Sequence, residues 1–222
     1  VGVNGTILNT SNGGTNWNAQ TSNISDTLNA VFFKDASYGW AVGANATIQK
    51  TTNGGASWAS QSSGTYNGDF YDVQFISISV GWIAGTGGAV FKTSNGGANW
   101  TRQDTKNSDD YFSVFFIDEN IGWVCGTFGT IINTKDGGAN WRMQSASTAH
   151  RMNSVQFFSN RIGWAAGNQG TIIHSVSGGD EVRANFVADT LIGIAPFTVN
   201  FTNQSTGYPS TYFWDFGDAS TS

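Results

Sequence analysis

The sequence predicts an all-β protein made of an arc of four-stranded β-propeller blades, followed by a shorter second β domain. A turn motif with two glycines recurs about every 41 residues, and a Gly-Trp dipeptide recurs with the same period. The 222 residues include 29 glycines and 14% aromatic residues but only 11% charged residues. This composition favours short strands between tight turns, with enough aromatic surface to build a core.

Each repeat contains four segments with the alternation or the short apolar run of a β-strand. In the first complete repeat, Asn29 to Phe33 predict one strand and Trp40 to Gly43 predict the next. A third strand leads into the two-glycine turn, and a Trp-led fourth strand closes the unit, which predicts one propeller blade. We expect an N-terminal blade without its opening strands, complete blades at 26–63, 67–104 and 108–145, and a further blade from about 149.

The two-glycine turn has the form Thr-x-Asn/Asp-Gly-Gly-x-x-Trp. The Asn or Asp oxygen can accept backbone N–H bonds across the turn, the glycines supply positive φ, and the Trp can pack over the hairpin. An Asn in three of the four copies keeps the acceptor but drops the charge, so we predict a structural role and not a catalytic or metal-binding one. The turn residues are Asn12 with Trp17, Asn53 with Trp58, Asn95 with Trp100, and Asp136 with Trp141.

This turn resembles the Asp-box (BNR-like repeat) of sialidases and sortilin-type receptors. Together with Gly-Trp-x-x-Gly and Gly-Thr-Ile, the pattern over residues 1–180 resembles propellers of the photosystem II stability and assembly factor type. The resemblance implies an architecture that serves several functions. Our main interpretation is a non-catalytic binding or structural module of a larger secreted or cell-surface protein from a bacterium or an archaeon. The alternatives are part of a secreted glycoside hydrolase, sialidase-like or xyloglucanase-like, and a photosystem assembly factor-like protein.

The repeat is predicted to stop after Gly179, because the fifth turn, around Gly178 and Gly179, has no Trp. The segment from Ala195 to Phe201 and the string from Phe213 to Asp218, which includes Trp-Asp-Phe-Gly-Asp, resemble a polycystic kidney disease (PKD) domain. That resemblance implies that residues 181–222 form the truncated N-terminal part of an Ig-like β-sandwich. We also expect the parent protein to be longer at both ends.

The candidate ligand-binding residues lie in the inter-blade linkers and in the turns between second and third strands. These segments share one face of a propeller, while the Asp-boxes lie on the opposite face, and the resemblance implies that ligands use the first. Mixed aromatic and charged side chains suit contact with a protein or a polysaccharide. The residues on this face that depart from the repeat are Tyr66, Asp69, Phe70, Asp109, Asp110, Tyr111, Phe128, His150 and Arg151.

Several other functions are disfavoured. The net charge of −5 and the scattered basic residues argue against nucleic-acid binding. No apolar run approaches the ~18 residues of a membrane helix, so we expect no direct membrane insertion. Asp69 with Asp109 or Asp110 is the only carboxylate pair that a glycosidase could use, and the repeat accounts for these positions without catalysis. His174 aligns with polar residues in every copy, which predicts a solvated strand position.

We therefore predict no enzymatic activity, no cofactor and no metal site, because none of the sequence motifs for such sites is present. The predicted partners are a protein or a polysaccharide at the cell surface, together with other domains of the same longer chain.

Overall fold

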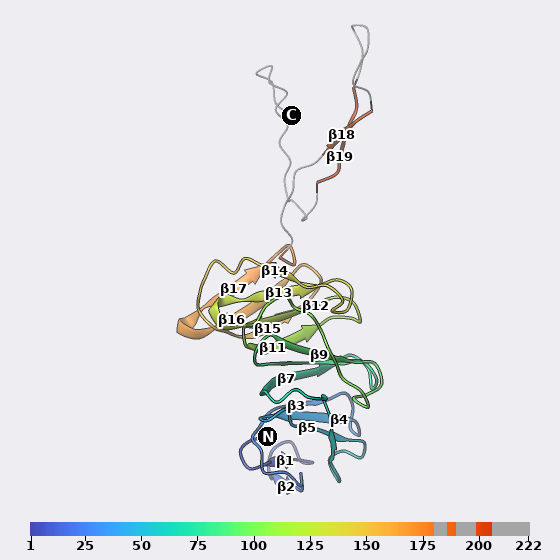
Figure 1. Cartoon of the computed structure of the whole chain (residues 1–222), viewed down its shortest axis with the longest axis vertical. Helices are drawn as coiled ribbons and strands as arrows, with labels where there is room; N and C mark the ends of the chain where they lie inside the picture. The colour runs from blue at the N-terminus through green and yellow to red at the C-terminus, as the bar shows by residue number, and fades with distance from the viewer. Residues whose placement is uncertain (180–185, 190–198, 206–222) are drawn as a thin grey trace.

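The computed structural model describes residues 1–179, 186–189 and 199–205. In this part of the chain nearly all regular structure is β, and Figure 1 shows successive antiparallel sheets stacked from the N-terminus upward. The predicted all-β architecture with a propeller arc is confirmed. The described residues hold no helix of the length and apolarity that crossing a bilayer requires.

Three complete blades each have four strands in the order of the sequence. Blade 2 comprises β3 (Leu28–Phe33), β4 (Gly39–Gly43), β5 (Ile48–Thr51) and β6 (Ala59–Gln61). Blade 3 comprises β7 (Phe70–Phe75), β8 (Gly81–Gly85), β9 (Ala89–Thr93) and β10 (Thr101–Arg102). Blade 4 comprises β11 (Tyr111–Phe116), β12 (Gly122–Gly126), β13 (Ile131–Thr134) and β14 (Arg142–Gln144), with the short 3₁₀ turn η1 (Thr127–Gly129) between its second and third strands.

The terminal sheets of the arc have fewer strands. Blade 1 contributes its two outer strands, β1 (Ile7–Asn9) and β2 (Asn18–Gln20). Among the described residues blade 5 has three strands, β15 (Met152–Phe157), β16 (Gly163–Gly167) and β17 (Ile172–Ser175), with η2 (Asn168–Gly170) before the last of them. A separate hairpin pairs β18 (Phe186–Ala188) with β19 (Phe201–Asn203).

The core lies between the blades, where aromatic rings of one sheet meet those of the next. Trp40, Trp82 and Trp123, each in the second strand of its blade, are fully buried. The first strands of neighbouring blades, β3, β7, β11 and β15, also contact one another in order, so they form the inner wall of the arc. This arrangement buries the aromatic surface that the composition required.

Each Asp-box turn is held by its first residue as well as by its Asn or Asp. In blade 2 the Thr51 hydroxyl accepts hydrogen bonds from the amides of Asn53 (3.3 Å) and Gly55 (2.8 Å). The Asn53 side chain accepts the Ser57 amide (2.9 Å). The box Trp58 then packs edge-on against Phe33 of the same blade, with ring centroids 5.9 Å apart.

The fifth turn also closes as an Asp-box, although its sequence lacks the Trp. The Ser175 hydroxyl accepts the amides of Ser177 (3.4 Å) and Gly179 (3.1 Å), as Thr does in the other boxes. Gly178 and Gly179 have positive φ values of 70° and 79°, and both glycines of every other copy also have positive φ. The repeat geometry therefore persists to Gly179, because it needs a hydroxyl and two glycines and not the Trp.

The sequence strings that predict a PKD-like domain lie largely outside the described residues. The string from Phe213 to Asp218 lies outside the described residues, as does most of the segment from Ala195 to Phe201. The β18–β19 hairpin is the only part of 181–222 with described strands. A second domain at 181–222 stays a prediction.

Candidate ligand-binding face

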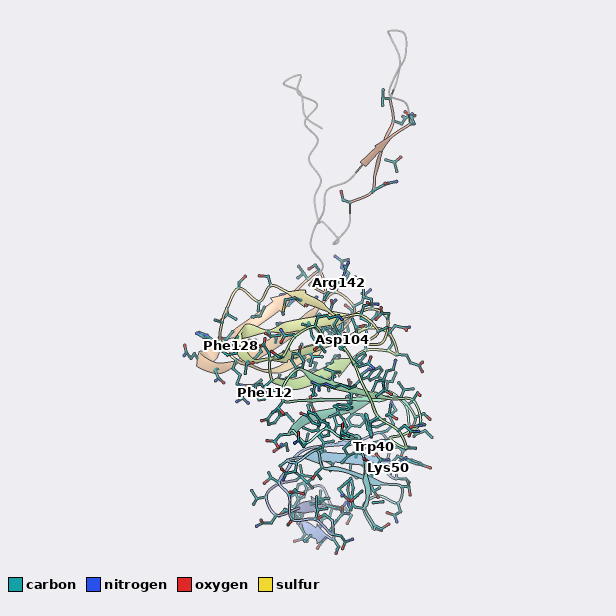
Figure 2. The ribbon with its side chains drawn as sticks, in the orientation of Figure 1. Trp40, Lys50, Asp104, Phe112, Phe128 and Arg142 are labelled. Carbon is teal, nitrogen blue, oxygen red and sulfur yellow. The ribbon has the colours of Figure 1, made fainter. Side chains whose placement is uncertain are left out.

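The two ends of every blade carry different segments. Phe75 pairs with Gly81 at the Asp-box end of blade 3, and Phe70 pairs with Gly85 at the opposite end, where the linkers and the second turns lie. Figure 2 shows Phe112 and Phe128 at one edge of the arc, and Trp40 and Lys50 at the other. We call the edge with the linkers the linker face.

Two predicted ligand residues lie instead in the core. Phe70 and Tyr111 are both 0% exposed, and they occupy the position that Leu28 and Met152 fill in the neighbouring blades. Burial raises the pKa of the Tyr111 hydroxyl to about 12. Neither side chain can reach a ligand, so the expectation that they form part of the binding face is wrong.

Tyr66 is half-buried and ties its linker to the neighbouring turn. Its hydroxyl lies 2.8 Å from Thr86 Oγ1 and donates to the Thr86 carbonyl at 3.0 Å. Its ring stacks on Phe70, with centroids 5.0 Å apart, and the Arg102 guanidinium lies 5.7 Å above it. Burial is the main reason that the pKa of Tyr66 is raised. These contacts give Tyr66 a structural role.

The predicted acidic residues accept hydrogen bonds from turns. An Asp69 carboxylate oxygen accepts the amide of Asn45 in the preceding blade (3.1 Å), and Asp110 accepts the amide of Gly87 in the same way (2.9 Å). Asp109 accepts the hydroxyl of Thr130. Asp69 and Asp110 thus supply acceptors for the backbone N–H groups of two turn residues in the left-handed region, Asn45 and Gly87.

His150 takes the place of Asp109 in the next blade. Its Nδ1 lies 2.9 Å from the Thr171 hydroxyl, as the Asp109 carboxylate lies against Thr130. His150 therefore makes its side-chain hydrogen bond within its own blade, to Thr171. This contact explains why the linker has a polar residue at this position.

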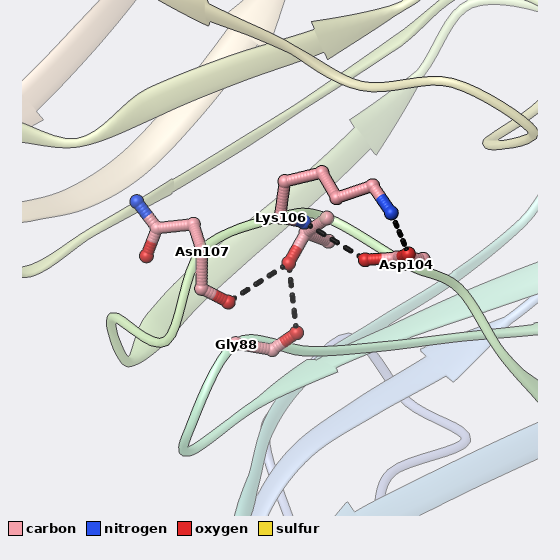
Figure 3. Close-up of polar contacts among 5 residues, drawn as sticks. Gly88, Asp104, Lys106 and Asn107 are labelled. Atoms are coloured by element: carbon pink, nitrogen blue, oxygen red, sulfur yellow. Dashed lines mark hydrogen bonds and ion pairs between the residues drawn. The ribbon is translucent and has the colours of Figure 1, made fainter.

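The linker between blades 3 and 4 is fixed by further polar contacts, shown in Figure 3. The Thr105 hydroxyl donates toward the carbonyl oxygens of Gly88 (3.2 Å) and Asn107 (3.1 Å), and Lys106 pairs with Asp104. The linker borders an open hollow of about 430 Å³. Because its main contacts are within the chain, this linker is an ordered part of the linker face.

An aromatic cluster that the sequence analysis missed lies beside the predicted residues. It consists of Tyr71 and Phe112, the second residues of two adjacent inner strands, and Arg151. The rings of Tyr71 and Phe112 are 4.8 Å apart between centroids, and the Arg151 guanidinium lies 3.4 Å from the centre of the Phe112 ring. Both rings are half-buried and Arg151 is exposed. The cluster thus offers apolar area and a cation on one surface.

The electrostatic surroundings of Tyr71 connect this cluster to the predicted carboxylates. Its pKa is raised first by burial and then by the negative charges of Asp69 and Asp110, while Arg151 acts in the opposite direction. Of the residues predicted from the sequence, Asp69, Asp110 and Arg151 therefore act electrostatically on Tyr71, and Arg151 also contacts Phe112.

Phe128 is the most exposed aromatic side chain of the linker face. It is 75% exposed and has a φ of 54°, a left-handed conformation that a bulky residue rarely adopts. Its turn, η1, contacts β15 of the next blade. The equivalent turn residue also has positive φ in the other repeats, at Asn45, Gly87 and Gln169, so this conformation belongs to the turn. The exposure of its ring keeps Phe128 a candidate contact residue.

No group of three or more His, Cys, Asp or Glu side chains suited to a metal ion occurs among the described residues. The linker face offers groups for binding through ring contacts, charge and hydrogen bonds.

Comparison with solved structures shows the fold. YCF48 from Cyanidioschyzon merolae is 18% identical with a TM-score of 0.62, covering 78% of this chain and 63% of that protein. An ancestral GH74 enzyme is 16% identical with a TM-score of 0.58, covering 68% of this chain and 23% of the enzyme. The GH74 enzyme of Niastella koreensis is 13% identical with a TM-score of 0.55, covering 91% and 37%. The chain thus spans less than two thirds of each of these proteins.

No match was found among curated proteins. The profile of the Photosynthesis system II assembly factor YCF48 family matches twice, over residues 15–108 and 103–205. The second match continues past residue 180, into the region assigned from its sequence to another domain. Because the two matches together cover most of the sequence, the chain belongs to the Photosynthesis system II assembly factor YCF48 family.

Proposed function

We propose that this chain is a non-catalytic propeller module that binds a polypeptide segment of a partner protein on its linker face, in the manner of an assembly factor. The family match over residues 15–205 carries the proposal, because that family is named for an assembly factor. A photosystem partner, which the sequence analysis held as an alternative, is supported better by this match than the main interpretation, a module of a surface protein.

The chemistry of the linker face supports a protein ligand. Aromatic and arginine side chains are enriched among the residues that contribute most to protein interfaces. Tyr71, Phe112 and Arg151 supply this combination within one cluster, and Phe128 adds an exposed ring on the same face.

The carboxylates support binding over hydrolysis. A glycosidase needs one protonated carboxyl group and a second carboxylate facing the same bond. Asp69 and Asp110 accept turn amides, and Asp109 accepts a threonine hydroxyl. The GH74 enzymes resemble this chain in fold, at identities too low to carry their activity across. A secreted or cell-surface location and a polysaccharide ligand stay predictions.

A peptide array and a glycan array, probed with the labelled 222-residue chain, test the proposal. The array should include extended segments of photosystem II subunits. The variant Tyr71→Ala/Phe112→Ala/Arg151→Ala should weaken peptide binding at least about tenfold, since it removes both rings of a tilted aromatic pair and the cation beside them. The control is Phe158→Ala. Phe158 is an exposed aromatic residue (85%), but it follows β15 at the Asp-box end of the blade, away from the linker face.

The expected result is peptide binding that the triple variant loses and Phe158→Ala retains. Binding to glycans alone, or hydrolysis of xyloglucan by the wild-type chain, would contradict the proposal. Equal loss in the triple variant and the control would show that the ligand does not use the linker face.

A further inference from the structure

One position of the linkers carries a polar side chain before blades 2, 4 and 5 and a glycine before blade 3. The polar side chains each contact the hydroxyl of the Thr that precedes the third strand of the same blade. These residues are Asp26, Asp109 and His150. Blade 3 has Gly68 at this position, and Ala89 in place of the Thr removes the hydroxyl partner. The linker before blade 3 is therefore packed differently from the others.

The packing around Gly68 leaves no room for a side chain. A Cβ atom on this residue would overlap the Tyr66 hydroxyl oxygen and Thr86 Oγ1. These two oxygens are 2.8 Å apart, and the Tyr66 hydroxyl also contacts the Thr86 carbonyl at 3.0 Å, so neither group can give way without losing a hydrogen bond. The fold therefore requires a glycine directly after Asn67.

This requirement creates the sequence Asn67-Gly68, which is chemically labile. Asn is among the least durable residues of a protein, and a following glycine adds lability because it has no side chain to hinder the approach of its backbone nitrogen. In the reaction the deprotonated glycine nitrogen attacks the Asn Cγ atom, ammonia leaves, and a cyclic succinimide forms. Water then opens the ring at either carbonyl, which leaves aspartate or isoaspartate. The net change consumes one water and releases one ammonia, and it needs no other reactant.

In the other Asn-Gly pairs of the sequence, at least one of the two reacting groups is held. The backbone N–H of the glycine donates to a carbonyl oxygen at 2.8 to 2.9 Å in three of them, Gly5 to Asp26, Gly54 to Ser37, and Gly96 to Ser79. The Asn side-chain oxygen of each Asp-box accepts the amide four residues later, at 2.9 to 3.0 Å. These side chains are Asn12, Asn53 and Asn95. The attack on the Asn Cγ atom would first have to break these contacts.

The pair Asn67-Gly68 has no such restraint. Within the described part of the chain, neither the Asn67 side chain nor the Gly68 N–H has a hydrogen-bond partner, and Asn67 is exposed. The linker is nevertheless fixed on the far side of the pair, because the Gly68 carbonyl accepts the Ala46 N–H at 2.7 Å. The two reacting groups are thus free to meet while the chain around them stays in place.

We propose that Asn67 is a site of spontaneous deamidation on the linker face, through a succinimide formed by the Gly68 nitrogen. The reaction places a new carboxylate two residues from Asp69, so the linker face becomes more negative as the folded chain ages. The isoaspartate product also lengthens the main chain by one carbon directly before Gly68. The Asp-box asparagines keep their side-chain amides under the same conditions.

Ageing of the folded 222-residue chain tests the proposal. The chain is incubated at pH 6 and at pH 8, and parallel samples are incubated unfolded in urea. Proteolysis and fragmentation mass spectrometry then measure the conversion of each Asn separately. An isoaspartyl methyltransferase assay measures isoaspartate, which forms by opening of the succinimide and not by direct hydrolysis of the amide. The control variant is Asn67→Gln, which keeps an amide but would have to close a larger, less favourable ring.

In the folded chain Asn67 should convert at least about tenfold faster than Asn53 or Asn95, because each Asp-box must open locally before its Asn can react. In urea the three residues should convert at similar rates, since all three precede a glycine. Conversion of Asn67 should be faster at pH 8 than at pH 6, because the attacking nitrogen must lose its proton. Asn67→Gln should remove most of the isoaspartate that the folded chain forms.

Equal conversion of Asn67, Asn53 and Asn95 in the folded chain overturns the proposal. So does an Asn67 that stays intact in the folded chain but converts in urea, because the linker would then restrain it. Aspartate at position 67 without isoaspartate would show direct hydrolysis, against a succinimide formed by Gly68. If Asn67→Gln does not fold, Asn67→Ser replaces it, and isoaspartate that persists in the folded variant also contradicts the assignment to Asn67.

Discussion

Trp82 lies flat against Phe116 of the following blade, with ring centroids 3.6 Å apart and 8° between the ring planes. On the other side of Phe116, the box Trp141 packs edge-on at 6.1 Å. One phenylalanine thus joins the second strand of the preceding blade to the Asp-box of its own blade. The Trp of the Gly-Trp dipeptide and the Trp of the Asp-box therefore both contact the Phe116 ring. This arrangement gives both repeated Trp residues a structural role.

Trp82→Ala should lower the free energy of unfolding by about 3 to 5 kcal/mol, since it leaves a cavity at a fully buried junction. Urea unfolding followed by circular dichroism measures the change. Trp17→Ala is the control, because Trp17 is 59% exposed and should cost about 0.5 kcal/mol or less. Equal losses would show that the junction does not limit stability.

Gln74→Ala should destabilise the chain by about 1 to 3 kcal/mol, because two hydrogen bonds to the Phe116 backbone are lost inside the arc. Gln156→Ala changes the same residue type at the equivalent, exposed position of blade 5. It should leave the urea midpoint almost unchanged. A similar shift for both variants would mean that Gln74 acts within its own blade and not across the junction.

The repeat period was enough to predict the strands, the Asp-box turns and the number of complete blades. Which side chains of an inner strand point into the core and which lie on the linker face was harder to predict. Phe70 is buried in the core, and its neighbour Tyr71 lies on the linker face. The sequence analysis placed Phe70 in a linker, but it is the first residue of an inner strand. Each inner strand has a register shift after its first residue, as between Phe70 and Asp72. A bulge at this point changes which side chains face the core.

The same shift occurs between Tyr111 and Ser113 in blade 4. It places Tyr111 in the core and Phe112 on the linker face. An alignment with Leu28 and Met152, both apolar, could have identified the buried position in advance. The stack of Arg151 on Phe112 joins two blades, and no spacing within one repeat could have predicted it.

Thr51→Val should cost about 1 to 3 kcal/mol, because it leaves the Asn53 and Gly55 amides without their acceptor while keeping the shape of the side chain. Thr51→Ser keeps the hydroxyl and should cost much less. Ser175 makes the same two contacts in the fifth turn, which supports this expectation. Thermal unfolding of the two variants compares them directly, and equal Tm values would contradict a role for the hydroxyl.

Asp136→Asn should give a pH-dependent change in stability. The pKa of Asp136 is lowered, first by its hydrogen bond to the Asn140 side chain and then by the Asn140 amide. A carboxyl group whose pKa is lower in the folded state adds stability above its unfolded pKa, near 3.8, and loses it as the pH falls through the folded value.

The wild-type chain should therefore be slightly more stable than Asp136→Asn at neutral pH, by well under about 1 kcal/mol because the group is exposed and screened. The difference should shrink as the pH falls below about 4. Urea unfolding of both chains at pH 3 and pH 7 measures it. The other boxes carry Asn at this position, so the variant keeps the turn and isolates the charge. A difference that grows toward acid pH would show that the Asp136 carboxylate is not stabilised by its turn.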